Sequence, residues 1–324
     1  MNTCLVGLTS GGCRVLKDLS RVCGKNSKCI YISFDEEDLP TKEGSLLLKA
    51  NLKDFNSIYK LRGKAKHQLS KLDDLIEGSS FVIVINGLGC KTGSALAPLI
   101  CERIKAKGIM SLFIGLMPFK FEKNKHFLAG RTLEYIRKLC DGVILIDNDE
   151  LLDLYPNHTL EEAYSLANKT VTSLLSMLLH ANEYGFTLRK LFTQVSQGYT
   201  ILSLADSKER VEDAIEEVLS RAWSQVNLSK ANGLTALLKG KVTLKQLEEI
   251  VNILRVQGDD FELNTFVSSD NSAGIRAALV VSGLSYTKFN NYDPLLTLNQ
   301  LDAEFEYNMN NSAEGISNLT NIEV

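Results

Sequence analysis

The sequence predicts an α/β fold with two domains: a parallel-sheet domain in the N-terminal half and a smaller C-terminal α/β domain, joined by one long central helix. Three patterns predict it. Residues 1–150 alternate apolar runs with helical patterns, which is typical of a parallel sheet covered by helices on both faces. Residues 159–180 form a single long amphipathic pattern, and residues 198–285 repeat the alternation on a smaller scale. A chain of 324 residues is long enough for this arrangement.

The predicted strands of the first half are the most apolar segments of the chain. The run F-V-I-V-I at residues 81–85 suits a strand that is buried on both faces. Ligands of such sheets bind beyond the carboxyl ends of the strands, so the turns that follow the strands are expected to converge at one edge. Strands are predicted at residues 3–7, 28–34, 81–86, 110–116 and 142–147, and helices at 11–23, 66–77, 93–107 and 126–139.

The central helix and the elements of the second half follow in the sequence. Thr159 and Glu162 have the spacing of a capping box, which begins the helix. Residues 268–274 separate the last two predicted strands and suit a hairpin. In the second half, strands are predicted at 199–204, 233–238, 261–267 and 275–283, and helices at 209–223 and 243–256. The expected division is 1–158 for the first domain, 159–183 for the central helix, 184–285 for the second domain and 286–324 for an acidic, loose tail.

Composition excludes several classes of protein. Charged residues make up 23% and hydrophobic residues 44% of the chain, so a sizeable core is available and global disorder is excluded. The net charge of −3 gives no support for nucleic-acid binding. No apolar run reaches the roughly 18–20 residues of a membrane span, and the first residues do not resemble a signal peptide, so a cytoplasmic protein is expected. The cysteines and histidines are too scattered for a metal site, and the cysteines are expected to be free thiols.

Two glycine-rich turns are the candidate functional motifs. Gly87, Gly89 and Gly93 lie between a predicted strand and a helix, and Gly11 and Gly12 occupy the same kind of position near the start of the chain. The N-terminus of a helix carries unpaired N–H groups and partial positive charge, which suit a phosphate. Neither turn matches the dinucleotide fingerprint G-x-G-x-x-G or the loop G-x-x-x-x-G-K-[ST]. The sequence therefore indicates a nucleotide fold of another kind.

The order of five motifs resembles the FtsZ/tubulin superfamily, and FtsZ more than tubulin. G-L-G-C-K-T-G-S-A-L-A-P at 87–98 stands where that family has G-M-G-G-G-T-G-T-G-A-A-P. M-P-F-K-F-E at 117–122, I-D-N-D-E-L-L at 146–152 and Y-S-L-A-N at 164–168 resemble its K-P-F-x-F-E, I-P-N-D-x-L-L and F-x-x-A-N segments. S-S-D-N at 268–271, with the apolar strand after it, lies where the family has its last β-hairpin. The matches span roughly residues 3–284, which is far more specific than a single glycine loop.

The resemblance implies a guanine-nucleotide pocket that holds GTP or GDP, with Mg²⁺ as a candidate companion ion. Tyr164 would stack on the base and Asn168, one helical turn later, would bind its edge. Asn148 and Glu122 correspond to contacts with base or ribose, and Asp35 to an acidic residue of the second loop. The phosphate contacts would come from the two glycine loops: Gly11, Gly12, Gly87, Gly89, Lys91, Thr92, Gly93 and Ser94.

The two loops also depart from the family pattern. Thr9 and Ser10 interrupt the first glycine run, and Cys90 and Lys91 replace two glycines of the second. Each added Cβ restricts positive φ angles and narrows the approach of an anion to the backbone. Lys91 and Arg14 would offset this loss with point charges. The sequence predicts a pocket with altered phosphate geometry.

The segment that would complete catalysis has changed as well. In the family, a loop after the central helix of one subunit enters the pocket of the next, and an N-x-D-F-x-D motif there activates water. Residues 181–190 contain no aspartate, and Glu183 is their only acid, so no catalytic residue is assigned. The first hypothesis is an FtsZ-like cytoskeletal protein that binds guanine nucleotide, self-associates head to tail and hydrolyses GTP weakly or not at all.

Two alternatives stay open. One is a non-polymerising pseudo-GTPase that regulates a functional FtsZ homologue, which would then be its partner. The other is an oxidoreductase that uses Asp35 to bind the ribose of NAD, although the glycine fingerprint for this is absent.

Overall fold

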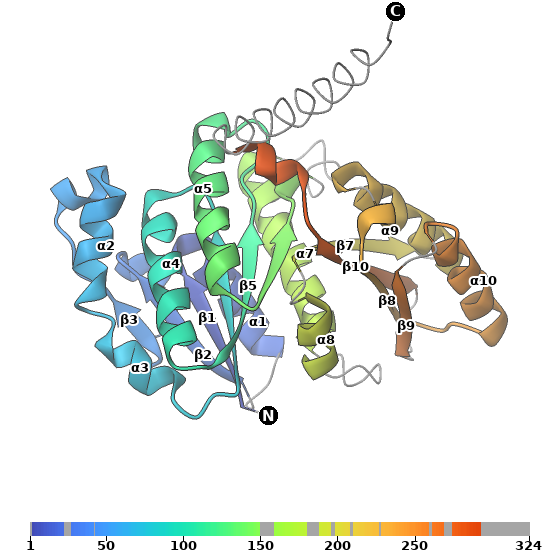
Figure 1. Ribbon diagram of the computed structural model, residues 1–324, viewed down its shortest axis with the longest axis horizontal. Helices are drawn as coiled ribbons and strands as arrows, with labels where there is room; N and C mark the ends of the chain where they lie inside the picture. The colour runs from blue at the N-terminus through green and yellow to red at the C-terminus, as the bar shows by residue number, and fades with distance from the viewer. Residues whose placement is uncertain are drawn as a thin grey trace, which may run out of the picture.

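The computed structural model describes residues 2–22, 27–41, 43–149, 159–179, 188–195, 198–207, 210–226, 228–258, 261–268 and 274–292. Within these residues, ten strands form one sheet in the order β3-β2-β1-β4-β5-β6-β7-β10-β8-β9 (Figure 1). All neighbouring strands are parallel except at β10, which is antiparallel to both β7 and β8. The strands are β1 Thr3–Leu8, β2 Ser27–Ser33, β3 Ser45–Leu47, β4 Phe81–Gly87, β5 Met110–Leu116, β6 Gly142–Ile146, β7 Tyr199–Ser207, β8 Gly233–Lys239, β9 Glu262–Ser268 and β10 Ile275–Leu284.

Helices cover both faces of the sheet, because its strands are buried on both sides. On one face, β4 contributes Val82 and Val84 to an apolar core with α3, α4, α5, α9 and α10; on the other, Ile83 and Ile85 pack with α1, α7 and α8. The helices are α1 Thr9–Val22, α2 Ile58–Lys66, α3 Ser70–Ile76, α4 Lys91–Ala106, α5 Lys123–Leu139, α7 Leu160–Leu179, α8 Leu188–Val195, α9 Val211–Gln225 and α10 Leu244–Arg255, with 3₁₀ turns η2 Glu36–Asp38, η3 Leu52–Asn56, η5 Leu228–Lys230 and η6 Lys288–Tyr292.

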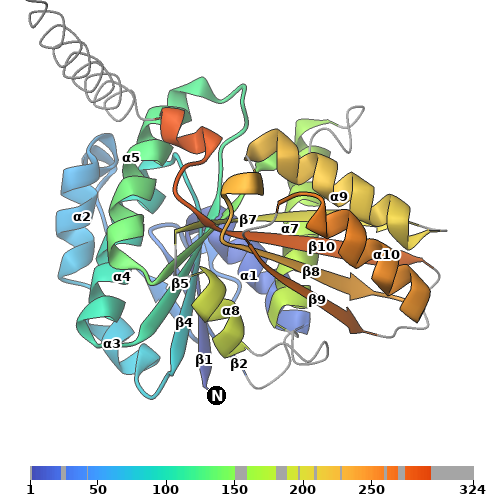
Figure 2. The ribbon, with the colours of Figure 1, turned by 45° about the vertical axis from the view of Figure 1, so that its right-hand side comes forward.

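The long helix α7 lies against both halves of the molecule, as expected for a central helix. Its predicted start is confirmed, because Thr159 and Glu162 exchange hydrogen bonds at 2.8 and 3.3 Å. It packs on α1 and on β7, and Ser173 accepts a 2.7 Å hydrogen bond from Arg276 of β10 (Figure 2). The sheet itself runs from one half to the other through the pairing of β6 with β7. The domain boundaries therefore stay a prediction.

Three expectations about the fold were wrong. The helix predicted at 66–77 is shorter in the structure, where α3 spans Ser70–Ile76, and the helix before it, α2 at Ile58–Lys66, was not predicted. The last two strands do not form a hairpin, because β8 lies between them: β9 pairs with one edge of β8 and β10 with the other. The first residues of the predicted loose tail are packed, since Phe289 of η6 is fully buried. Residues 293–324 of that predicted tail lie outside the described residues.

Candidate functional site

The junction of β1 with the first turn of α1, which contains Gly11 and Gly12, forms the first wall of a pocket at the carboxyl edge of the sheet. Helix α1 begins at Thr9 directly after β1, and Thr9 has a φ of 54°, which is uncommon for a residue other than glycine. Its hydroxyl donates a 3.4 Å hydrogen bond to Oδ1 of the fully buried Asn86 at the end of β4. The unusual backbone angle is thus accompanied by a side-chain contact between the two glycine loops.

The loop between β4 and α4 forms the second wall. Gly89 has a φ of 94°, which a side chain rarely adopts, and the Cβ of any other residue would lie 2.7 Å from Cβ of Lys125. Cys90 is the N-cap of α4, and its sulfur accepts a 3.2 Å hydrogen bond from the amide of Gly93. A thiol therefore fills the capping position that a hydroxyl or carboxylate more often occupies.

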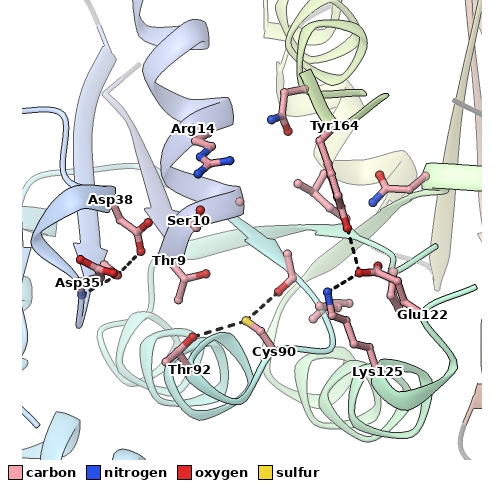
Figure 3. Close-up of a pocket in the computed structure, with 18 of the residues that line it drawn as sticks. Thr9, Ser10, Arg14, Asp35, Asp38, Cys90, Thr92, Glu122, Lys125 and Tyr164 are labelled. Carbon is pink, nitrogen blue, oxygen red and sulfur yellow. Dashed lines mark hydrogen bonds and ion pairs between the residues drawn. The ribbon is translucent and has the colours of Figure 1, made fainter. Parts of the chain in front are cut away.

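The two loops meet at a cavity of about 440 Å³, within the range of small-molecule sites (Figure 3). Gly11 and Gly87, the hydroxyls of Thr9, Ser10 and Thr92, and the N-terminal ends of α1 and α4 form its floor. Two helix N-termini directed at one cavity favour an anionic ligand. The remaining lining residues come from α1, α5, α7 and η3, from the β4–α4 loop, and from the ends of β2, β5 and β6 with the segments that follow them: Arg14, Ser33, Phe34, Asp35, Asp38, Phe55, Leu88, Cys90, Leu116, Met117, Pro118, Glu122, Lys125, Asn148, Tyr164 and Asn168.

Tyr164 and Glu122 form a hydrogen-bonded group at the α7 side of the cavity. The Tyr164 hydroxyl donates to Oε1 of Glu122 at 2.9 Å, Lys125 forms an ion pair with the same oxygen, and the Phe119 amide donates to Oε2 at 3.1 Å. The ring of Phe119 meets that of Tyr164 edge-on, with centroids 5.0 Å apart. Tyr164 is therefore held in place from its tip and from its side.

The same contacts shift two pKa values. Burial alone would raise the pKa of Glu122, but the hydrogen bonds from Lys125, Tyr164 and Phe119, with the charge of Lys125, hold it below its ordinary value of 4.5. Burial, together with the hydrogen bond to Glu122 and its charge, raises the pKa of Tyr164 to about 12. At neutral pH the site therefore contains an ionised Glu122 and a neutral Tyr164.

The opposite wall of the cavity carries acidic side chains from the turn after β2. Ser33 donates a 2.6 Å hydrogen bond to Asp38, and Asp35 caps η2 by accepting the amide of Glu37 at 3.0 Å. Two cations also reach the cavity. Lys125 is paired with Glu122, whereas Arg14 on α1 has no ion-pair partner among the described residues and points into the cavity in Figure 3. Arg14 is the cation that remains available for a ligand.

Eight of the predicted site residues line this cavity, and five do not. Gly12 and Gly93 are packed too closely against neighbouring atoms to carry a side chain. A Cβ on Gly12 would lie 2.1 Å from the carbonyl oxygen of Ile85, and a Cβ on Gly93 would lie 2.8 Å from Oδ1 of Asn86. Gly89 makes the turn, and Lys91 is an exposed residue at the start of α4. Ser94 is buried, and its hydroxyl has no hydrogen-bond partner in the described part of the chain. The eight lining residues are Gly11, Asp35, Gly87, Thr92, Glu122, Asn148, Tyr164 and Asn168.

Sequence reasoning missed several lining residues. Lys125 could have been found, because it stands three residues after Glu122, a spacing that brings side chains together on a helix. Phe55 carries no such signal; it reaches the cavity because η3 packs its ring edge-on against Phe34, with centroids 5.8 Å apart. His126 forms a 3.0 Å hydrogen bond with the Phe119 carbonyl and does not line the cavity.

Two structural findings bear on metal ions and membranes. Among the described residues, no group of three or more His, Cys, Asp or Glu side chains is placed to hold a metal ion. In that same part of the chain, no helix combines the length and apolarity needed to span a bilayer.

Comparisons with known proteins agree with this architecture. The family model described as Tubulin/FtsZ family, GTPase domain, matches residues 44–156. Cell division protein FtsZ 1 of Thermococcus kodakarensis is 25% identical over 305 residues, which cover 87% of this chain and 80% of that protein. Cell division protein FtsZ 2 of Methanocaldococcus jannaschii is 24% identical over 264 residues, which cover 76% and 70%.

Solved structures share the fold at low sequence identity. The empty FtsZ dimer of M. jannaschii superposes with a TM-score of 0.76 at 21% identity and covers 87% of this chain and 88% of its own. CetZ of Methanosaeta thermophila superposes with a TM-score of 0.75 at 17% identity over the full length of both chains. The parallel sheet, the two glycine loops at its carboxyl edge and the central helix thus define an α/β protein of the FtsZ/tubulin fold. Residues 44–156 match the tubulin/FtsZ GTPase domain family, and the chain is similar to FtsZ proteins at about 25% identity.

Proposed function

We propose that this protein binds GTP or GDP in the cavity between α1, α4 and α7, and that it self-associates head to tail while hydrolysing GTP weakly or not at all. One observation carries the proposal: two helix N-termini and an aromatic–amide pair line the same cavity. The first feature suits the phosphates of a nucleotide and the second suits its base. The family assignment favours a guanine nucleotide over NAD.

The phosphates would lie over the floor of the cavity. The amide ends of α1 and α4, the hydroxyls of Thr9 and Thr92, and the guanidinium of Arg14 are the groups that would hold them. Since Thr9 and Cys90 carry side chains where the family has glycine, fewer backbone amides are open to an anion. Charge and hydroxyl contacts would make up part of the difference.

The base would lie at the α7 end. Tyr164 offers an aromatic ring that Glu122 and Phe119 already hold in place, which reduces the entropy lost on binding. Asn168, one turn later on the same helix, offers a donor and an acceptor for the edge of a purine. Asn148 reaches the same cavity from the turn after β6 and would contact the base or the ribose.

Self-association is supported by two structural neighbours that were solved as protofilaments. One is a GTPγS-bound protofilament of CetZ2 from Haloferax volcanii, and another is a GTPγS-form protofilament of TubZ from Bacillus thuringiensis. We propose that this chain forms a longitudinal assembly of the same kind. Negative-stain electron microscopy with and without GTP tests it: filaments support it, and particles that stay single favour the non-polymerising pseudo-GTPase.

Weak hydrolysis is the part of the proposal that depends on the sequence alone. The segment at 181–190 lacks aspartate, and its first seven residues lie outside the described residues. Loss of a positioned base costs about 10²–10⁴ in rate. We therefore expect static filaments and little phosphate release at filament-forming concentrations. Rapid phosphate release by the purified protein would contradict this.

The nucleotide itself is tested directly. Protein purified under native conditions is denatured, and the released ligand is identified by absorbance and ion-exchange chromatography against GDP, GTP, ADP and NAD. Titration of ligand-free protein with GDP and ADP then measures selectivity. The proposal expects guanine nucleotide and a preference for GDP; a carried NAD or equal affinity for ADP would overturn it.

A further inference from the structure

The C-terminal turn η6 returns from β10 to the half of the molecule that contains the cavity. In Figures 1 and 2 it lies beside α5, with which it is in contact. Phe289 is fully buried there, and its ring meets Tyr292 edge-on with centroids 5.5 Å apart. A segment with a buried aromatic anchor is a fixed part of the fold rather than a trailing end.

Lys288 of this turn contacts the side chain of Asp147, the residue directly before Asn148 of the cavity. Its ammonium forms an ion pair with Asp147, whose side chain is 0% exposed, whereas that of Lys288 is 37% exposed. Asp147 also accepts the amide of Asp149 at 3.0 Å. Asn148, which lines the cavity, stands between these two residues. The carboxylate that shapes this turn thus depends on a cation from the far end of the chain, because a buried carboxylate without a partner is costly.

Tyr292 makes a second, separate contact toward the cavity. Its ring stacks on His126 with centroids 3.9 Å apart and an angle of 3°. His126 bonds the carbonyl of Phe119 at 3.0 Å, and Phe119 holds Glu122 through its amide and Tyr164 through its ring. The same short turn therefore supports the cavity at Asn148 and at the Tyr164–Glu122 group.

We propose that Lys288 is a positioning residue of the nucleotide pocket, which holds Asn148 in place through Asp147 and so couples the C-terminal turn to guanine-nucleotide affinity. The inference rests on the proposed function. Coupling between two sites is reciprocal: if η6 favours the nucleotide-binding arrangement, bound nucleotide must favour the docked η6 by the same factor. Anything that detaches η6 from α5 would then weaken nucleotide binding.

The first test uses the wild-type protein, so that it does not depend on the folding of a variant. Hydrogen exchange of the amides at 288–292 is followed with and without saturating GDP. Coupling predicts slower exchange with GDP, although these residues do not touch the cavity. An unchanged rate would overturn the inference, because a merely structural turn has no reason to respond.

The second test uses variants. Lys288→Ala is expected to weaken GDP binding about 5-fold or more, and Lys288→Arg to restore most of the affinity. Lys241→Ala, which removes an exposed lysine after β8, is the matched control and should bind as the wild type does. If Lys288→Ala does not fold, the double variant Asp147→Asn with Lys288→Met removes both charges and takes its place. It is expected to fold and still to bind GDP more weakly.

The outcomes separate the two levels of inference. Failure of the wild type to bind GDP would refute the proposed function. Normal GDP binding by Lys288→Ala, with GDP-independent exchange at 288–292, would leave the proposed function standing and refute the coupling.

Discussion

Substitution of Gly12 by alanine is the sharpest test of how the first glycine loop is built. The new Cβ would lie 2.1 Å from the carbonyl oxygen of Ile85, a separation that real Cβ atoms essentially never show. The atoms that the Cβ meets belong to the backbone of Ile85 and cannot rotate away, so α1 and β4 must separate by about 1 Å. Overpacking of this kind costs about 1–3 kcal/mol. Alanine gains at most about 1 kcal/mol over glycine in a helix. We expect the free energy of unfolding to fall by about 2 kcal/mol, which is the upper end of the overpacking cost, about 3 kcal/mol, less the gain of about 1 kcal/mol from alanine.

The neighbouring Gly11 provides a matched control. A Cβ at Gly11 would lie 3.6 Å from Cα of Gly87, an ordinary contact, so Gly11→Ala should be as stable as the wild type or up to about 1 kcal/mol more stable. Because Gly11 lines the cavity, its added methyl group should weaken GDP binding.

Urea unfolding of the ligand-free proteins, followed by circular dichroism, measures both changes in the free energy of unfolding. Equal stability of Gly12→Ala and wild type would refute the packing of α1 on β4. Equal destabilisation by Gly11→Ala and Gly12→Ala would show that the loss of stability comes from any side chain in this turn and not from the one close contact at Gly12.

Three further variants, one of them a double substitution, test the site. Tyr164→Ala combined with Asn168→Ala should weaken GDP binding at least about 100-fold, measured by calorimetry, through lost stacking and lost hydrogen bonds; retained affinity would refute the base assignment. Arg14→Ala should weaken the binding of GDP about tenfold and that of guanosine little, because guanosine has no phosphate. The control Lys107→Ala, at the end of α4 away from the cavity, should change neither affinity. For Glu122, whose pKa is lowered in the fold, ionisation stabilises the protein above the ordinary value of 4.5, and this contribution is lost as pH falls through the lower folded pKa. The difference in melting temperature between wild type and Glu122→Gln should therefore be largest at neutral pH and vanish in acid; a constant difference would contradict this.

The central strands could be predicted closely, because burial on both faces leaves a continuous apolar run. The strand predicted at 110–116 has those bounds in the structure, and that at 81–86 ends one residue later. Strand pairing in the second half could not be read from loop length, because the seven residues at 268–274 are enough both for a hairpin and for a connection across β8. The alternation E-L-N-T-F-V-S of β9, which is half-exposed, is typical of an edge strand, and the apolar run of β10 is typical of a central one. That contrast was present in the sequence, but it does not show that β8 lies between the two strands, which tertiary pairing decides.

The site could be predicted where a motif carries the signal and not where packing alone decides. Tyr164, Asn168 and Asn148 stand in ordered motifs, and the structure places all three at one cavity. Phe55 enters the cavity through η3, whose place depends on contacts with Phe34. The turn η6 was assigned to a loose tail, since its place in the fold depends on a buried aromatic ring and on a part-buried ion pair between residues 141 positions apart, which no local pattern reveals.

The altered glycine loops show how a pocket can survive the loss of the residues that usually shape it. Thr9 adopts a left-handed φ without being glycine, at a cost of about 1 kcal/mol or more, and its hydroxyl gains a contact with Asn86 that glycine cannot make. Cys90 adds a side chain at the start of α4, and its sulfur caps the amide of Gly93. In both loops the added side chain has a partner within the protein, so neither closes the cavity. The position of each helix N-terminus depends on the strand and helix behind it, so the cavity persists although side chains stand where the family motif has glycine.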